Sequence, residues 1–291
     1  MRLSVLLLAL VAGSAWLHVA PVHLARNCAA APTGLGFAAL PQGHAHNDYR
    51  HPHPLTSALR QGFTSVEADV WPVHGRLLVA HDRDQVDVSR SLKRLYLDPL
   101  ARALRAGRAP TGVQLLVDVK GDPASTLPLL RTELASYAGM LTRYRATDDG
   151  CTSTAGPVSV VVSGNAPPVA PQPGTTSLFG YDDPIRPDEQ PPVEEAVAPL
   201  ASGDWGAFFT WDGHGPMPPS EHDRLVDLVA AAHEAGSRIR FWDTPDAPGP
   251  ARAALWRELA ADGVDYVNTD DLAGYARFVR SSPAMSTAVS R

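Results

Sequence analysis

Two carboxylates and a histidine occur close together in the segment Gly62 to Asp82, which reads GFTSVEADVWPVHGRLLVAHD. Glu67 and Asp69 are two residues apart in a strand-like run, so their side chains point to the same face of the strand. Two acids on one face of a buried strand repel each other unless a cation or a proton lies between them. His81 follows a second apolar run, which brings a proton carrier to the same region. The segment is therefore a candidate metal and acid/base site, although a solvated acidic edge strand would show the same alternation.

Two other segments carry side chains that suit this chemistry. GHAHNDY places His44, His46 and Asn47 directly after an apolar run, where a solvated polar turn is the alternative. LLVDVKGD places Asp118 and Lys120 on one face of a further strand, where a buried ion pair is the alternative. Three carboxylates at neighbouring strand ends suit a hard divalent cation such as Mg²⁺ or Ca²⁺, which prefers oxygen ligands.

Short apolar runs and helical patterns alternate after residue 36, and this alternation predicts a parallel sheet. Eight strand–helix units indicate a closed (β/α)8 TIM barrel. The predicted strands are Ala38–His44, Thr64–Val70, Val113–Lys120, Val158–Ser163, Thr176–Gly180, Ala207–Trp211, Arg238–Trp242 and Asp265–Thr269. The predicted helices are Pro54–Gln61, Leu92–Ala106, Ala124–Leu141, Val193–Leu200, Ser220–Ala235, Pro250–Ala261 and Leu272–Arg280.

The polar residues fall at one end of these predicted strands. Active sites of (β/α)8 barrels lie at the carboxyl ends of the strands, so we expect the site at this rim. The residues at the rim are His44, Glu67, Asp69, Asp118, Lys120, Asn165, Trp211, Asp212, Trp242, Asn268 and Asp270.

Length and composition limit the other possibilities. The 291 residues fit a leader over residues 1–32 and a single barrel domain over residues 33–291. The leader has one arginine followed by an apolar run, which predicts a signal peptide and a secreted or extracytoplasmic protein; an uncleaved membrane anchor is the alternative. In an oxidising compartment Cys28 and Cys151 could pair. A net charge of −6 without a basic run excludes a nucleic-acid surface, and we expect a monomer.

The motifs GHAHNDY, SVEADVW, LLVAHD and RFWDTPD together resemble the phosphodiesterase superfamily of phospholipase C-like barrels. That superfamily includes glycerophosphodiester phosphodiesterases, phosphatidylinositol-specific phospholipase C and spider-venom sphingomyelinase D. The resemblance covers nearly the whole chain after residue 36. It is strongest to the branch of proteins similar to altered inheritance of mitochondria protein 6.

The resemblance assigns a role to each residue of the candidate site. It implies that His44 and His81 are the catalytic acid and base, and that Lys120 contacts the phosphate. The metal ion, Mg²⁺ or Ca²⁺, would be held by Glu67, Asp69 and Asp118. Substrate-binding residues would be Lys120, Asn47 and Trp242.

The resemblance also implies the reaction, which is hydrolysis of a phosphoric diester such as a glycerophosphodiester or a (lyso)phospholipid. In the family the attacking group is often a hydroxyl of the substrate itself, which yields a cyclic phosphate. A lipid substrate would bring the protein into transient contact with a membrane surface. The HRG signature of glycerophosphodiesterases is replaced by G-H-x-x-N, which leaves His46 as a competitor of His44 for the catalytic role.

Two other functions fit parts of the sequence. His44 and His46 form an H-x-H motif, as in metal hydrolases of the amidohydrolase type. That class needs further histidine ligands from strands five and six, whereas no histidine occurs between Asp82 and Gly213. A non-catalytic barrel that binds a lipid or a sugar phosphate would keep the fold and hydrolyse no diester.

Overall fold

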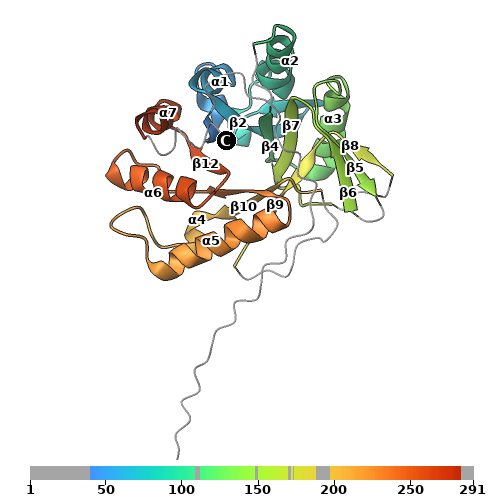
Figure 1. Ribbon diagram of the computed structural model, residues 1–291. Helices are drawn as coiled ribbons and strands as arrows, with labels where there is room; N and C mark the ends of the chain where they lie inside the picture. Colours follow the sequence, from blue (N-terminus) through green and yellow to red (C-terminus); the bar gives the residue numbers. More distant parts are fainter. Residues whose placement is uncertain are drawn as a thin grey trace, which may run out of the picture.

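Eight parallel strands close into a barrel in the computed structural model of the protein (Figure 1). The structure describes residues 40–108, 112–147, 150–169, 172, 174–187 and 197–282. Each strand pairs with its neighbours in the order β1-β2-β4-β7-β9-β10-β11-β12, and pairing of β12 with β1 closes the circle. The barrel strands are β1 (Leu40–Ala45), β2 (Phe63–Val73), β4 (Val113–Val119), β7 (Val158–Gly164), β9 (Gly180–Ile185), β10 (Leu200–Asp204), β11 (Arg238–Trp242) and β12 (Tyr266–Thr269). The predicted (β/α)8 TIM barrel is confirmed.

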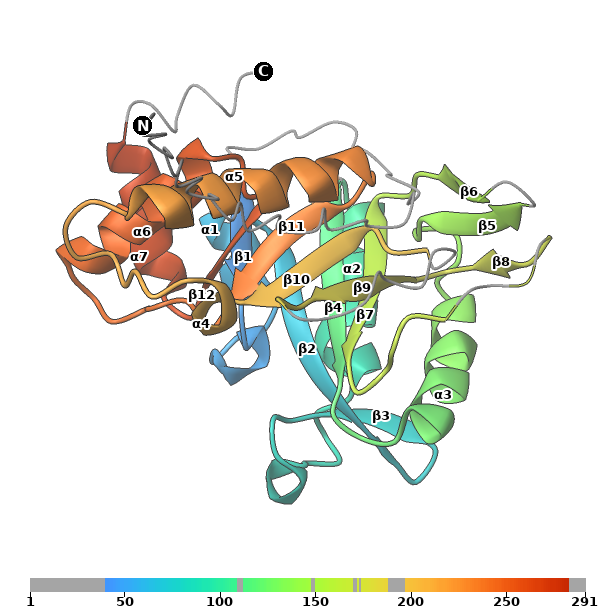
Figure 2. The same cartoon turned by 90° about the horizontal axis from the view of Figure 1, so that it is seen from below.

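Helices cover the outside of the barrel, and the two views agree on their placement (Figures 1 and 2). Helices α6 (Pro250–Ala261) and α7 (Leu272–Ser281) lie on one side, while α3 (Pro123–Ala135) lies on the other. The remaining helices are α1 (Thr56–Gln61), α2 (Asp98–Arg105), α4 (Trp205–Phe208) and α5 (Pro219–Glu234), with a π-helical turn η3 (Lys93–Leu97) before α2 and short 3₁₀ turns η1 (Asp48–Arg50) and η2 (Arg83–Gln85).

Strands such as β4 and β7 are buried on both faces, which explains their mostly apolar sequences, VQLLVDV and VSVVVSG. On β2, Val66, Ala68 and Val70 join the large core between the barrel and the helices. The alternate residues of the strands point into the barrel, where an apolar layer fills its interior. That layer consists of Leu116, Val161, Leu200 and Tyr266 from four different strands. Asp118 follows Leu116 by two residues on the same face of β4, so it lies nearer the mouth than this apolar layer.

Two predicted strands are wrong. Strand five is β9, and the predicted stretch Thr176–Gly180 contributes only β8 (Thr176–Ser177) to a separate sheet. Strand six is β10, which ends at Asp204, and Ala207–Trp211 follows it as the end of α4 and a loop. The Asp204 side chain accepts a hydrogen bond from the Gly206 backbone N–H (2.9 Å) and so starts a helix where the apolar run WGAFFTW predicts a strand.

The helix predicted at Val193–Leu200 lies partly outside the described residues. Its last residue, Leu200, begins β10, so the end of that prediction is wrong. Trp211 and Asp212, predicted at the end of strand six, lie in the loop after α4.

Two additions extend the barrel. β3 (Arg76–Val79) pairs antiparallel with the outer part of β2. A three-stranded sheet of β5 (Arg143–Thr147), β6 (Gly150–Thr154) and β8 lies beside α3 (Figure 2). These additions lengthen one side of the barrel wall.

The leader and the first cysteine lie outside the described residues. Residues 1–32, predicted as a signal peptide or anchor, and Cys28 both belong to the part of the chain that is not described. Cys151, on β6, is not a free thiol. Within the described residues no helix is both long enough and apolar enough to span a bilayer.

Candidate active site at the carboxyl ends of the strands

The structure brings Glu67, Asp69, Asp118 and Lys120 together inside the rim of the barrel. Glu67 and Asp69 are buried on β2, and Asp69 lies opposite Asp118 of β4 in the register of the two strands. The ammonium nitrogen of Lys120 lies 3.2 Å from Asp69 Oδ2 and 3.1 Å from Asp118 Oδ1. Both carboxylates therefore share one cation, and the contact between Asp118 and Lys120 is the ion pair that the sequence offered as the alternative for this segment.

Asp69 is short of positive charge in spite of Lys120. Its Oδ2 accepts a hydrogen bond from the Tyr49 hydroxyl (2.8 Å), but its buried Oδ1 has no hydrogen-bond partner. Burial, together with the negative charges of Glu67 and Asp118, raises the pKa of Asp69 to about 7. A second cation beside this carboxyl group would lower its pKa and satisfy the free oxygen.

Gly164, the last residue of β7, makes room for Asp118. It has a φ of +76°, and a Cβ atom at this position would lie 2.6 Å from Asp118 Oδ1. Any other residue would push that carboxylate out of place. The Ser163 hydroxyl donates to Asp118 Oδ2 (3.0 Å), so β7 fixes the carboxylate on both sides.

Glu67 is held by Arg240, a residue that the sequence reasoning missed. Arg240 Nη1 donates to Glu67 Oε2 (2.8 Å), while its Nε donates to the Ser202 hydroxyl (3.2 Å). Arg240 Nη2 lies 4.0 Å from Asp182 Oδ2, so this buried arginine lies between two acids. Although burial raises the pKa of Glu67, the hydrogen bond from His44 and the charge of Arg240 outweigh it and hold that pKa well below its ordinary value. The alternation RIRFW, with Arg240 and Trp242 on one face of a strand, was the available signal.

His44 has no contact with solvent. Its Nδ1 lies 2.7 Å from the Ser65 hydroxyl, and its Nε2 lies 3.0 Å from Glu67 Oε2 and 2.8 Å from Arg240 Nη1. Burial and the charge of Arg240 lower the pKa of His44 to about 4, so the ring is neutral at pH 7. Protein groups thus occupy both ring nitrogens of the histidine that the resemblance places in the catalytic role.

His46 is open to the mouth of the barrel. Its side chain is 31% exposed, and its Nδ1 lies 2.9 Å from Asp270 Oδ1, at the end of β12. Its Nε2 lies 3.8 Å from Glu67 Oε1, so the free edge of the ring faces the carboxylate cluster. Burial lowers the pKa of His46, but the hydrogen bond to Asp270 and the charge of Glu67 raise it more, and the net shift is upward.

Asn47 positions these groups and has little capacity left for a ligand. Its φ of +49° turns the chain sharply after β1, and its side chain is buried. The amide nitrogen lies 3.0 Å from His46 Nδ1 and 3.4 Å from Asp270 Oδ1, while the amide oxygen accepts from the Tyr49 hydroxyl (2.6 Å). Asn47 therefore connects the His46 side of the site with Asp69.

His81 and Trp242 lie at the rim with their side chains exposed. The side chain of His81 is 42% exposed and lies 3.1 Å from Asp82 Oδ1. Its neighbour Ala80 donates its backbone N–H to the Asp69 carbonyl oxygen (3.2 Å), which places His81 one residue from the carboxylate strand. Trp242 is 41% exposed and lies two residues beyond Arg240 on β11, so it faces the mouth.

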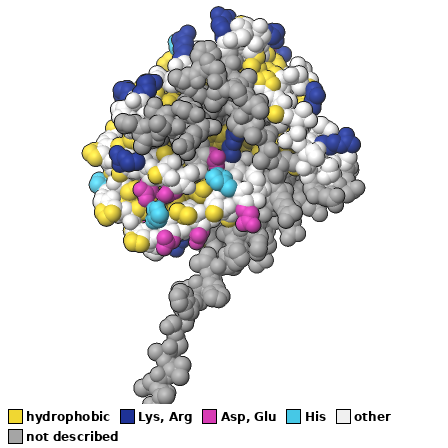
Figure 3. Space-filling view, viewed as in Figure 1, with side chains coloured by type: hydrophobic (Ala, Val, Ile, Leu, Met, Phe, Trp, Pro, Cys, Tyr) yellow, Lys and Arg dark blue, Asp and Glu magenta, His cyan; other side chains and the backbone are white. Residues whose placement is uncertain are grey.

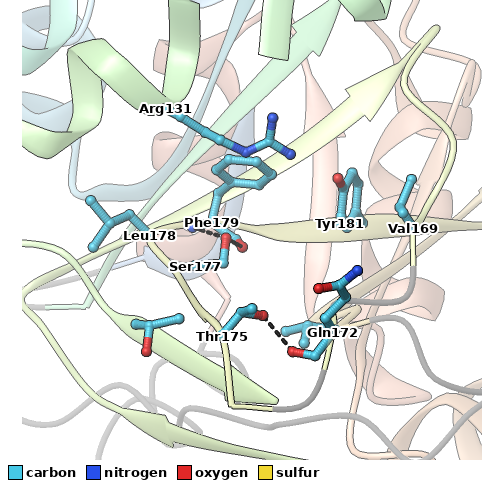
Figure 4. Close-up of a pocket in the computed structure, with 10 residues that line it drawn as sticks. Arg131, Val169, Gln172, Thr175, Ser177, Leu178, Phe179 and Tyr181 are labelled. Atoms are coloured by element: carbon cyan, nitrogen blue, oxygen red, sulfur yellow. Dashed lines mark hydrogen bonds between the residues drawn. The ribbon is translucent and has the colours of Figure 1, made fainter. Parts of the chain in front are cut away.

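Two further features of the described residues lie elsewhere. One set of three possible metal-ligand side chains has its ligand atoms within 4.8 Å of one another, and it consists of His222, Glu258 and Asp262 on the outer helices. The ligand atoms of Glu67, Asp69 and Asp118 do not all lie within this distance of one another, and Lys120 and Arg240 contact these carboxylates. A pocket of about 420 Å³ opens between α3 and β9, where Phe179, Tyr181 and Arg131 line it (Figure 4). None of its lining residues belongs to the site at the rim.

Comparisons with known proteins identify phosphodiesterase domains and relatives of this chain. Residues 39–113 match the AIM6-like phosphodiesterase domain, and residues 238–273 match the glycerophosphoryl diester phosphodiesterase family. The chain is 31% identical to altered inheritance of mitochondria protein 6 of Eremothecium gossypii, over 81% of this chain and 68% of the relative. It is 28% identical to the homologue of that protein in Arthroderma benhamiae, over 79% of this chain and 81% of the relative. No solved structure matches the chain.

Proposed function

Because the chain belongs to the altered inheritance of mitochondria protein 6 family, we propose that it is a phosphoric diester hydrolase with its active site at the mouth of the barrel. One observation carries the proposal: Glu67, Asp69 and Asp118 lie on adjacent strands, with Lys120 within 3.2 Å of two of them. Such a cluster of carboxylates is costly to bury unless cations compensate its negative charge, and a cation held there can in turn bind an anionic substrate. The proposed substrate is a glycerophosphodiester or a (lyso)phospholipid-like diester.

A divalent ion fits the donors and the charge of this cluster. Four acids (Glu67, Asp69, Asp118 and Asp182) face only two permanent cations, Lys120 and Arg240. The partnerless Oδ1 of Asp69 offers a free ligand atom, and all donors are oxygens, as Mg²⁺ and Ca²⁺ prefer. Glycerophosphoryl diester phosphodiesterases typically depend on a metal. In the proposal Glu67, Asp69 and Asp118 hold the ion, which polarises a phosphoryl oxygen when bound.

His46 is the better placed of the two histidines on β1 to move a proton. Its Nδ1 is fixed by Asp270, while its Nε2 faces the carboxylate cluster. A carboxylate on one ring nitrogen orients a histidine and stabilises its charged form. His44, enclosed by Ser65, Glu67 and Arg240, orients Glu67 in this proposal and does not touch the substrate.

His81 completes the acid/base pair from the segment after β3. It follows β3 beside Asp69, its side chain is exposed, and a loop histidine there can approach a bound diester. Lys120 contacts a non-bridging phosphate oxygen, which places a positive charge where negative charge increases in the transition state. Trp242 forms an apolar wall for the alcohol part of the substrate.

The proposed reaction proceeds in two proton transfers. One histidine takes the proton of a hydroxyl of the substrate, whose oxygen then forms a bond to phosphorus. The bond from phosphorus to the leaving alcohol oxygen breaks, and the other histidine donates a proton to that oxygen. The products are a cyclic phosphate and a free alcohol. A water molecule in place of the internal hydroxyl gives a monoester instead.

Hydrolysis of bis-p-nitrophenyl phosphate and of lysophospholipids, with and without a chelator, tests the proposal. We expect turnover with Mg²⁺ or Ca²⁺ that a chelator abolishes. His46→Ala and His81→Ala should each lower kcat by about 10²–10⁴. His53→Ala is the matched control, because His53 is an exposed histidine of the loop after β1, and it should leave kcat unchanged.

The same assay separates the alternatives. If the protein binds phosphate compounds but hydrolyses none of the diesters, the proposal of an enzyme is wrong and the protein is a non-catalytic binding barrel. Normal kcat in His46→Ala together with loss in His44→Ala would return the catalytic role to His44, provided that His44→Ala is folded by circular dichroism. Identification of the products by mass distinguishes the cyclic phosphate from the monoester.

A further inference from the structure

A histidine and two carboxylates meet on the outside of the barrel, where α5 and α6 pack together. His222 lies in the first turns of α5, Glu258 lies on α6, and Asp262 caps the carboxyl end of α6. Acidic and histidine side chains gather over these two helices in the surface view (Figure 3). The three residues share no contact with the cluster at the mouth of the barrel.

The distances within this group are too long for hydrogen bonds. His222 Nε2 lies 3.4 Å from Asp262 Oδ1 and 3.9 Å from Glu258 Oε1, whereas N–H···O bonds are about 2.7–3.2 Å long. Ligand atoms about 2.0–2.1 Å from a tetrahedral ion are about 3.3–3.4 Å apart. The first distance has this value, and a small movement of the half-buried Glu258 side chain would bring the second to it.

Among the described residues, no permanent cation lies beside the Asp262 carboxylate. Its side chain is only 12% exposed, and its Oδ2 is buried without a hydrogen-bond partner. It lies at the carboxyl end of α6, where the helix dipole is negative and disfavours a carboxylate. Glu258 lies four residues before it, and like charges at this spacing repel each other. An ion between the two carboxylates would remove both penalties.

We propose that His222, Glu258 and Asp262 bind a divalent transition ion of the zinc type, which joins α5 to α6. An imidazole with two carboxylates suits Zn²⁺ and related ions, whereas Mg²⁺ and Ca²⁺ prefer oxygen ligands alone. The site is distinct from the proposed catalytic cluster in its elements, its donors and its preferred ion. Since α5 and α6 are consecutive helices on either side of β11, the ion would stabilise the part of the barrel that carries Arg240.

Calorimetric titration of the full chain with Zn²⁺ tests this site. The protein carries no affinity tag and is first treated with a chelator, and the titration contains excess Mg²⁺ to fill the oxygen-ligand cluster. We expect the wild-type protein to bind one Zn²⁺ per chain. In His222→Ala this binding should be lost, or its affinity should fall at least about 100-fold. Asp262→Asn and Glu258→Gln should weaken the same binding event.

His233→Ala is the matched control. His233 lies on the same helix and contacts a single carboxylate, Asp265 (2.8 Å), so its removal should leave Zn²⁺ binding unchanged. Zn²⁺ should raise the Tm of the wild-type protein and of His233→Ala, but not that of His222→Ala. Equal Zn²⁺ stoichiometry and affinity in the wild type, His222→Ala and Asp262→Asn would overturn the proposal. So would a wild-type Tm that Zn²⁺ does not change.

Discussion

Replacement of Arg240 by methionine should destabilise the barrel strongly. The substitution keeps most of the volume of the side chain but removes the donors to Glu67 (2.8 Å) and Ser202 (3.2 Å). Glu67 and Asp182 would then stay buried without a permanent cation beside them. Breaking a buried ion pair on one side costs about 3–5 kcal/mol. For a domain of this size each kcal/mol lowers Tm by about 2–4 °C, so we expect a decrease of about 6–20 °C.

Thermal and urea unfolding, followed by circular dichroism, measure this effect. Arg238→Met is the matched control, because Arg238 lies on the same strand but donates to the Tyr266 hydroxyl, and loss of that bond should cost about 0.5–1.5 kcal/mol. In the double variant with Glu67→Gln the loss should be smaller than the sum of the single losses, since both charges are then removed. A cost below about 1 kcal/mol for Arg240→Met, or strictly additive losses, would refute the role assigned to this ion pair.

Three other predictions concern the mouth of the barrel. Asp270→Asn should lower the pKa of His46, because the Asp270 carboxylate raises that pKa in the wild type. The limb of the pH–rate profile that reports His46 should therefore move to lower pH, and an unchanged profile would contradict the role of His46. Gly164→Ala should lower the free energy of unfolding by about 1–3 kcal/mol more than Gly174→Ala does. Both glycines have a positive φ, but only at Gly164 would a Cβ atom clash with Asp118, and equal unfolding free energies of the two variants would contradict this. Mg²⁺ or Ca²⁺ should raise the Tm of chelator-treated protein, and an unchanged Tm would argue against the proposed ion.

The sequence predicted several of the barrel strands with nearly correct bounds. Arg238–Trp242 was placed with the bounds that the structure shows, and Val113–Val119 to within one residue. β9 was misplaced because GYDDPI contains two acids and a proline, which are typical of a turn. Asp182 and Asp183 of that strand are nevertheless buried, and burial raises the pKa of each to about 6. Asp182 lies beside Arg240 inside the barrel, whereas Asp183, the next residue of the strand, points to the opposite face. The burial of both faces of β9, which only the assembled barrel provides, explains the place of these acids in a strand.

Local sequence patterns were sufficient to predict the site residues that lie on one strand or on neighbouring strands. The i, i+2 spacing of Glu67 and Asp69 and the repeat at Asp118 and Lys120 placed all four side chains at one rim. Arg240 was missed because its meaning depends on Glu67, 173 positions earlier in the chain. Arg240 and Glu67 become neighbours only when the barrel closes, and no local sequence pattern indicates this contact.

The pairing of the first strand with the last has a consequence for the order in which the protein matures. His46 follows β1 and Asp270 follows β12, so their contact joins residues 224 positions apart. A ribosome must therefore release almost the whole chain before this contact can form. Contacts between such distant residues are also slow to form during folding. A nascent or truncated chain that lacks β12 should consequently be inert, and hydrolysis should begin only when the complete polypeptide has folded.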